Sequence, residues 1–175
     1  MKKLRSIMFW FLLANCIYLQ AQTHRFIYEV DYRKDSTDNN KTKEYWHLDI
    51  NPKESFYYER HYFISDSVLK ATDEMKFLGK MTDIVRKDLS KKEYGTLTWQ
   101  GIDSFILKDK PTQKWQITPE VKEEKGLKSQ KATTSWGGRR WTAWFIAEIP
   151  FQEGPYKFSG LPGLISEIYD DKDNY

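Results

Sequence analysis

Ser67 and Lys70 are the first residues whose types and spacing could carry out chemistry. They have the Ser-x-x-Lys spacing of serine acyltransferases, in which a lysine activates a serine nucleophile. With 11 serines and 21 lysines in 175 residues, about one such match is expected by chance. The companion motifs of that chemistry do not occur in the sequence. We therefore predict no catalytic residue from this pair.

Histidines and carboxylates give the second candidate group. His47 and His61 would face each other across a hairpin that turns near Asn51, and Asp49 lies close to them. A transition metal accepts such ligands. Histidines on neighbouring strands are more often ordinary polar residues, so we predict neither a metal site nor a cofactor. Glu148 has apolar neighbours and is kept as a candidate binding residue, although a hydrogen-bonded loop carboxylate is the preferred interpretation.

The aromatic content of 16% has two interpretations. Large aromatic side chains could line a ligand cavity in a curved sheet, where they suit apolar or sugar ligands. They could equally form the core of a β domain without disulfides, which is the interpretation we favour. The tryptophans concerned are Trp46, Trp99, Trp115, Trp136, Trp141 and Trp144.

Alternating apolar and polar residues predict that most of these side chains lie on β-strands. In the first such run, Phe26, Tyr28, Val30 and Tyr32 share one face. Helical spacing from 65 to 78 predicts one short helix, with Ser65 or Asp66 at its start. Further strands are expected around residues 45–50, 55–61, 83–89, 93–100, 104–108 and 114–117.

The clearest hairpin runs from Ser129 to Ile146. Gly137 and Gly138 separate two alternating runs, as in a two-residue type I′ turn that needs positive φ at both positions. That turn places Thr134 opposite Trp141, Ala132 opposite Ala143 and Lys131 opposite Trp144. The face that carries Ala132, Trp136, Trp141, Ala143 and Phe145 is expected to be buried.

The amino terminus resembles an export signal. Lys2, Lys3 and Arg5 precede an apolar run of about 13 residues, which is too short to span a bilayer comfortably. We predict a signal peptide over 1–22 and one β domain over 23–175, with no transmembrane span after cleavage. Lipidation at Cys16, the only cysteine, is the less favoured alternative. Without Cys16, the remaining chain has no thiol for redox or zinc chemistry.

Charge excludes one class of partner. Residues 23–175 carry 25 basic and 25 acidic side chains, whereas a protein that neutralises many phosphates is basic. Nucleic acid is therefore not an expected partner. At the other end of the chain, 164–169 reads as a strand and 170–174 as a turn, after which Tyr175 would begin a partner strand. This pattern predicts a chain truncated at its C-terminus.

Several blocks in the last third of the chain resemble the GLPGLI family of exported proteins. The namesake motif is Gly160-Leu161-Pro162-Gly163-Leu164-Ile165, and the flanking blocks occur in order. These blocks are Lys114-Trp115-Gln116-Ile117-Thr118, Lys131-Ala132-Thr133, Ala143-Trp144-Phe145, Glu148-Ile149-Pro150 and Gly154-Pro155-Tyr156-Lys157-Phe158. Ser129 stands where similar sequences often have a cysteine, so no thiol role carries over. The resemblance implies no established activity, but it implies an association of some members with TonB-dependent outer-membrane systems.

The motif itself holds no nucleophile, acid, base or metal ligand. Pro162 and Gly163 suit the two central positions of a type II turn, with positive φ at Gly163. We expect Leu161 and Phe158 to fill the apolar interior, and the alternative is an exposed docking patch of Leu161 and Leu164. The candidate binding residues are Trp144, Phe145, Glu148, Phe158, Leu161 and Leu164.

Together these observations predict a mainly β fold. We expect a single antiparallel sheet, strongly curved or half-barrel as in periplasmic lipoprotein-carrier folds, with one short helix. The expected function is that of a non-enzymatic binding or accessory protein in the periplasm or cell envelope of a Gram-negative bacterium. A hydrophobic ligand or an envelope protein would be the partner. The alternative is a hydrolase whose catalytic residues lie in loops or in a missing C-terminal segment.

Overall fold

The computed structural model describes residues 22–33, 40–72, 82–100, 103–172 and 174–175. The predicted signal peptide therefore lies outside the described residues, except for its last position. The described part is mostly strand, with antiparallel pairing throughout and one short helix, so the predicted mainly β class is confirmed. The described helix, α2 (Arg60–Thr72), is not long and apolar enough to cross a membrane.

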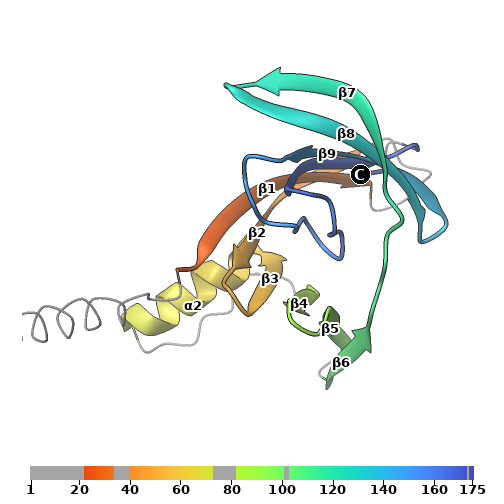
Figure 1. The fold of residues 1–175 in the computed structure, drawn as a ribbon. Helices are drawn as coiled ribbons and strands as arrows, with labels where there is room; N and C mark the ends of the chain where they lie inside the picture. The colour runs from red at the N-terminus through yellow and green to blue at the C-terminus, as the bar shows by residue number, and fades with distance from the viewer. Residues whose placement is uncertain (1–21, 34–39, 73–81, 101–102, 173) are drawn as a thin grey trace, which may run out of the picture.

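The strands form two sheets rather than the single sheet that was expected (Figure 1). The first sheet has the order β1-β2-β3-β4-β5-β6, and the second has the order β10-β9-β8-β7. The first contains β1 (His24–Arg33), β2 (Lys41–Ile50), β3 (Glu54–Glu59), β4 (Ile84–Asp88), β5 (Glu93–Gln100) and β6 (Asp103–Asp109). The second contains β7 (Gln116–Glu124), β8 (Leu127–Trp136), β9 (Arg139–Ile146) and β10 (Leu164–Asp170).

The division into two sheets follows from the segment between β6 and β7. It contains Pro111, which has no backbone N–H to donate to a ladder, and it runs as an extended connector to the second sheet (Figure 1). The first sheet is strongly curved, as predicted. Its edge strand β1, at the opposite end of the sheet from β6, lies against the second sheet. There the Tyr28 hydroxyl donates to the carbonyl of Ile165 at 2.6 Å.

The β8–β9 hairpin has the predicted register. Thr134 pairs with Trp141, Ala132 with Ala143 and Lys131 with Trp144. Gly137 and Gly138 have φ of 60° and 75°, as a type I′ turn requires. Ala132, Trp141, Ala143 and Phe145 are buried, which confirms the predicted inner face.

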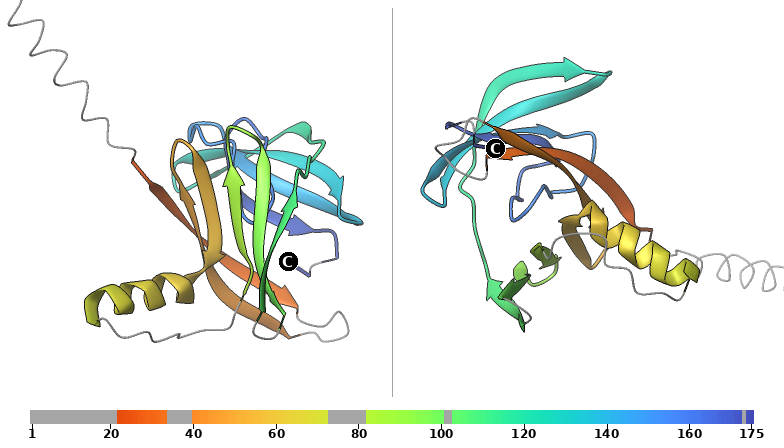
Figure 2. Two further views of the ribbon diagram at one scale, coloured as in Figure 1. Left: turned by 90° about the horizontal axis from the view of Figure 1, so that it is seen from below. Right: turned by 180° about the vertical axis from the view of Figure 1, so that it is seen from behind.

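The helix overlaps the predicted segment but begins five residues before Ser65. Glu59 explains this start, because its Oε2 atom accepts the backbone N–H of His61 at 3.0 Å, as an N-cap side chain does. The proposed start at Ser65 or Asp66 is therefore wrong, and residues 73–78 of the prediction lie outside the described residues. Both views of Figure 2 show α2 extending away from the sheets beyond the end of β3.

The connection between β9 and β10, residues 147–163, is the feature that positions the site. We call it the interior loop, because it enters the concave side of the first sheet (Figure 1). Phe158 and Leu161 of this loop are 4% and 1% exposed, and they pack with Trp141, Phe145 and Ile165 in one core cluster. The expectation that Phe158 and Leu161 fill the interior is confirmed.

The GLPGLI-like motif ends the interior loop, but it does not form the predicted type II turn. Gly163 has a positive φ, as predicted, but its value of 157° is far from the φ of about +80° that this turn needs at its third position. The N–H of Leu164 donates to Ile149 at 3.1 Å instead of closing a turn onto Leu161. Leu164 is 4% exposed, so the alternative of a docking patch made of Leu161 and Leu164 is wrong.

Candidate functional site

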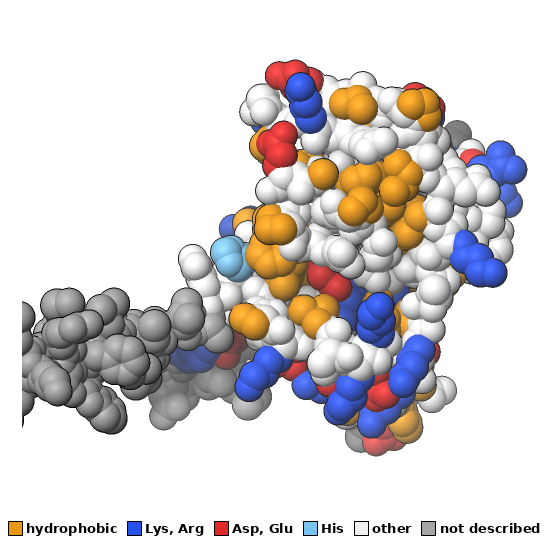
Figure 3. Space-filling view, viewed as in Figure 1, with side chains coloured by type: hydrophobic (Ala, Val, Ile, Leu, Met, Phe, Trp, Pro, Cys, Tyr) orange, Lys and Arg blue, Asp and Glu red, His pale blue; other side chains and the backbone are white. Residues whose placement is uncertain are grey.

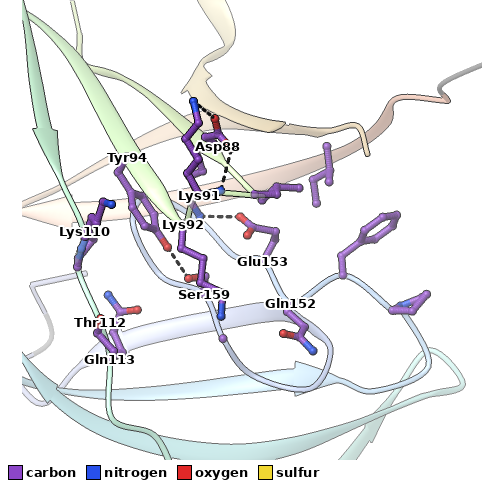
Figure 4. A pocket seen from close by; sticks show the side chains of 17 residues that line it. Asp88, Lys91, Lys92, Tyr94, Lys110, Thr112, Gln113, Gln152, Glu153 and Ser159 are labelled. Atoms are coloured by element: carbon purple, nitrogen blue, oxygen red, sulfur yellow. Dashed lines mark hydrogen bonds and ion pairs between the residues drawn. The ribbon is translucent and has the colours of Figure 1, made fainter. Parts of the chain in front are cut away.

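A cavity of 510 Å³ opens where the interior loop meets the first sheet (Figure 4). Its walls come from four segments that are distant in sequence: the end of β2, the β4–β5 hairpin, the connector between β6 and β7, and the interior loop. Ile50, Leu89, Pro150 and Phe151 supply apolar surface. Polar and charged surface comes from Lys87, Asp88, Lys91, Lys92, Tyr94, Lys110, Thr112, Gln113, Gln152, Glu153 and Ser159.

A buried ion pair joins two of these walls. Lys87 is 2% exposed, and its Nζ atom lies 3.0 Å from Glu153 Oε2. The same ammonium group donates to the carbonyls of Gly154 and Phe158, each at 3.0 Å. The Ser55 hydroxyl donates to Glu153 Oε2 at 3.0 Å. Burial lowers the pKa of Lys87, and the negative charge of Glu153 opposes that shift.

Further hydrogen bonds anchor the interior loop. The Tyr94 and Ser159 hydroxyls lie 2.6 Å apart, and Trp115 Nε1 donates to the Ser159 carbonyl at 2.8 Å. Lys157 donates to Asp109 Oδ2 at 2.6 Å, which ties the loop to the end of β6. Burial raises the pKa of Tyr94, so its hydroxyl remains protonated at neutral pH. These bonds hold the loop to the first sheet and to the connector, and they fix the cavity wall that the loop forms.

The β4–β5 turn forms the rim of the cavity. Asp88 Oδ1 accepts the N–H groups of Ser90 and Lys91 at 3.1 and 3.0 Å, and the Ser90 hydroxyl at 2.7 Å. The Ser90 hydroxyl and the Lys91 N–H lower the pKa of Asp88 to about 2. Lys91 pairs with Asp88 at 3.5 Å, while Lys92 extends across the pocket (Figure 4). Basic side chains, with acidic ones among them, lie at this end of the molecule, over β4–β6 (Figure 3).

The Asp88 turn makes stability depend on pH in the acid range. A carboxyl whose folded pKa is depressed contributes stability that is present above its unfolded pKa of 3.8 and is lost as the pH falls toward about 2. The melting temperature of the wild type should therefore fall between pH 4 and pH 2. Asp88→Asn keeps the acceptor oxygen but has no charge to lose, so its melting temperature should fall less. Circular dichroism melts at pH 4, 3 and 2 test this, and parallel profiles for the two proteins would contradict it.

These groups are arranged for binding more than for acid–base chemistry. The Ser159 hydroxyl is paired with a tyrosine hydroxyl, which is a poor base at neutral pH. Lys87 already has three acceptors within 3.0 Å, so its ammonium group is engaged in holding the loop. Lys92, Thr112 and Gln152 instead present donors to the cavity from exposed positions.

A second, larger hollow of 1060 Å³ lies between α2 and the outer face of the first sheet. Its polar lining is largely paired: Arg25 donates to both carboxylate oxygens of Asp49 at 2.7 Å, and Arg86 donates to Glu54 at 2.6 Å. Phe63 of α2 covers Arg25, whose guanidinium carbon lies 4.2 Å from the ring centroid. The cavity at the interior loop has the more convergent polar groups, and it is our candidate site.

The structure does not bring the six predicted binding residues together at this cavity. Phe145, Phe158 and Leu161 share one core cluster, whereas Leu164 belongs to the second cluster, with Leu48, Ile50 and Tyr57. Trp144 lies on the other face of β9, with Lys122 Nζ 4.5 Å from its ring centroid. Glu148 is exposed in the interior loop rather than set among apolar side chains. None of the six is among the cavity-lining residues, and their role in binding stays a prediction.

The structure also shows where the two histidines and the Ser-x-x-Lys pair lie. His47 pairs with Tyr58 in the β2–β3 ladder and His61 lies in α2, so the expected facing of the two histidines is wrong. Among the described residues, no group of three or more His, Cys, Asp or Glu could hold a metal ion. Ser67 donates to the carbonyl of Phe63 at 2.8 Å, and Lys70 pairs with Asp66 at 2.7 Å. The serine and the lysine of the Ser-x-x-Lys pair therefore interact with different partners.

Most of the tryptophans serve the core. Trp141 is buried there, Trp115 and Trp136 pack against the same cluster, and Trp46 packs against the second one. Trp99 stacks on Tyr62 of α2 with ring centroids 5.9 Å apart. No tryptophan lines either cavity, which favours the core interpretation over a tryptophan-lined ligand site.

Sequence reasoning missed Lys87, Glu153 and the lysines of the rim. Lys87 did leave a signal, because alternation along β4 places it on the same face as Val85, which is 1% exposed. A lysine on a buried face needs a partner of opposite charge. No local pattern could identify that partner as Glu153, which is 66 positions away in the chain.

Comparisons with known proteins give one family match. Residues 97–167 match a family profile described as a protein of unknown function (Porph_ging). This range contains the blocks from Lys114 to Ile165 that carry the sequence resemblance, and it includes β7 to β9 with the interior loop. No curated protein sequence matches the chain.

Two solved structures of PNGF-II have a similar fold. The structure in space group C2 has a TM-score of 0.61 and 13% identity over 87% of this chain. The structure in space group P21 has a TM-score of 0.60 and 14% identity, also over 87% of this chain. The chain spans about a quarter of the length of these PNGF-II chains, 26% and 27%. At such identity the likeness shows the fold alone.

Proposed function

We propose that this chain is a non-enzymatic binding or accessory protein of the cell envelope, and that its ligand enters the cavity at the interior loop. The observation that carries the proposal is that the lining residues fall into two groups with different roles. Lys87 and Glu153 hold the loop in place, while Lys92, Thr112 and Gln152 present donors to an open space of 510 Å³. Pockets of about 300–1,000 Å³ with a few placed polar groups are typical of small-ligand sites.

The hydrolase alternative receives less support from the same groups. A hydrolase needs a nucleophile within hydrogen-bond reach of a base, or a carboxylic acid and a base on opposite sides of a scissile bond. In the cavity, the Ser159 hydroxyl pairs with Tyr94, and the Glu153 carboxylate pairs with Lys87 and Ser55. Binding is therefore the function that this arrangement supports better.

The envelope location rests on the amino-terminal residues, where a basic start precedes an apolar run of secretory length. Membership of the GLPGLI family rests on the motif from Gly160 to Ile165, and the link with TonB-dependent systems rests on that resemblance in turn. The structure supports a structural role for the motif, because Leu161, Leu164 and Ile165 are all buried. Our proposal therefore includes export to the envelope, membership of the GLPGLI family and a link with TonB-dependent systems.

Filling the cavity tests the binding function. Thr112 is exposed on the connector and lines the cavity, so Thr112→Trp should occupy the space without disturbing the core. We expect wild-type protein purified from its own cells to carry a small molecule detectable by native mass spectrometry, and Thr112→Trp to lose it. The melting temperature should change by less than about 2 °C, as is usual for surface substitutions.

Gln116→Trp is the matched control, since Gln116 is exposed at the start of β7 and does not line the cavity. That variant should retain the molecule. Retention by Thr112→Trp would show that the ligand binds elsewhere, and loss by both variants would show that the loss does not result from filling the cavity.

A further inference from the structure

The cavity has an excess of positive charge that no structural role explains. Four lysines and two carboxylates line it. Lys87 and Glu153 neutralise each other inside the protein, and Lys91 lies 3.5 Å from Asp88 on the rim. The excess therefore comes from the remaining two lysines, Lys92 and Lys110.

Neither of these two lysines is held in a strong ion pair. Lys110 Nζ lies 3.7 Å from Glu93 Oε2, and the Lys110 side chain is 65% exposed, so this contact is weak. For Lys92, no acidic partner occurs among the described residues within ion-pair distance. The two lysines reach the cavity from different segments, since Lys92 belongs to the β4–β5 turn and Lys110 to the connector.

The turn geometry fixes the backbone at Lys92. Its φ of 51° is left-handed, a conformation that glycine adopts without cost and that other residues rarely adopt. Asp88 fixes the turn by accepting the N–H groups of Ser90 and Lys91, so the chain direction at Lys92 is set. The side chain then extends across the cavity (Figure 4).

Another part of the cavity is lined by apolar side chains. Phe151, Pro150, Leu89 and Ile50 line the cavity there, and the Phe151 ring packs against Phe26 with centroids 5.8 Å apart. An apolar group in contact with these side chains would leave water, which is favourable. The volume of 510 Å³ corresponds to roughly 15 to 20 water-sized units at about 30 Å³ each.

We propose that the ligand is a small anionic amphiphile. Its carboxylate or phosphate group lies between Lys92 and Lys110, within reach of the Thr112 hydroxyl, and its apolar body lies against Phe151 and Leu89. The inference rests on the proposed binding function and names the class of ligand. A molecule of roughly 10 to 20 non-hydrogen atoms fits this volume.

Matched probes of one chain length separate the head group from the tail. Isothermal titration of the purified protein should show binding of octanoate and octyl phosphate, and affinity should fall as NaCl is raised. 1-Octanol, octyltrimethylammonium and inorganic phosphate should each bind at least tenfold more weakly than octyl phosphate. Preference for octyl phosphate over octanoate would identify the head group as phosphate, and the reverse preference would identify it as carboxylate.

Variants of Lys92 distinguish a ligand contact from a structural role. Lys92→Gly relieves the left-handed backbone, so its melting temperature should equal or exceed that of the wild type, while its affinity for octanoate and octyl phosphate falls at least tenfold. Lys110→Met should weaken binding in the same direction. Lys128→Met, at an exposed position of β8 outside the cavity, should bind like the wild type.

Each contrary result overturns a stated part of the inference. Equal binding of octanol and octanoate would overturn the anionic class, and equal binding of inorganic phosphate and octyl phosphate would overturn the apolar body. Unchanged affinity in Lys92→Gly would remove Lys92 from the site. If no probe binds, the inference fails as a whole, and the molecule retained or lost by Thr112→Trp decides separately whether the binding function survives.

Discussion

Gly163→Ala is expected to destabilise the protein by at least about 3 kcal/mol, because the backbone of β9 leaves no space for a side chain. A Cβ atom at Gly163 would lie 2.3 Å from the carbonyl oxygen of Ile146, 2.7 Å from its carbonyl carbon and 2.8 Å from Ala147 Cα. All three are backbone atoms, so no side-chain rotation can relieve the contact. Gly163→Val should cost more still. Urea unfolding followed by tryptophan fluorescence measures the loss.

Gly160 provides a control within the same motif. Its φ of 89° is left-handed, but a Cβ atom there would meet nothing within 4 Å. Gly160→Ala should therefore cost only about 1–2 kcal/mol, which is the strain of a left-handed backbone. If the two alanine variants are destabilised equally, close approach to β9 is not the reason for glycine at position 163.

Lys87→Met should be the most damaging change at the site, at about 3–5 kcal/mol. The substitution leaves the Glu153 carboxylate, which is 7% exposed, without its positive partner. It also removes the donor to the carbonyls of Gly154 and Phe158. Thermal unfolding at neutral pH should show a markedly lower melting temperature, and the interior loop should become sensitive to proteolysis at its exposed positions, such as Tyr156.

Glu153→Gln is the informative partner of that variant. Lys87 would keep its two carbonyl acceptors and could also donate to the amide oxygen of the glutamine, so the cost should be smaller than that of Lys87→Met. This ordering follows from the number of hydrogen bonds that each change removes. The reverse ordering would mean that the carboxylate, and not the ammonium group, organises the loop.

The sequence was most informative where local geometry alone determines the structure. Alternation predicted most of the strand runs, although β7 continues to Glu124, beyond the predicted end at 117. The two adjacent glycines at 137 and 138 determined the pairing of Thr134 with Trp141. A period of two has only two possible faces, and the face with the larger apolar side chains is buried. The burial of Phe158 and Leu161 was predicted from their apolar side chains at a turn that returns the chain to the sheet.

The site could not be predicted, because it depends on contacts between distant segments. Lys87, Lys110 and Glu153 come from a strand, a connector and a loop, and only the docking of the two sheets brings them together. The division into two sheets also escaped prediction, since alternation does not say which strands become neighbours. At Gly163, composition suggested a type II turn, whereas the glycine is needed because β9 passes so close.

The described strands pass from one sheet to the other only once in sequence, between β6 and β7. Within each sheet, neighbours in space are neighbours in the chain, so most strand pairs form from contacts of short sequence separation. The bonds between the sheets close much longer loops, such as the 137 positions that separate Tyr28 from Ile165. We therefore expect two meanders to form early in folding and their docking to limit its rate, with Lys87 leaving water only in that last step.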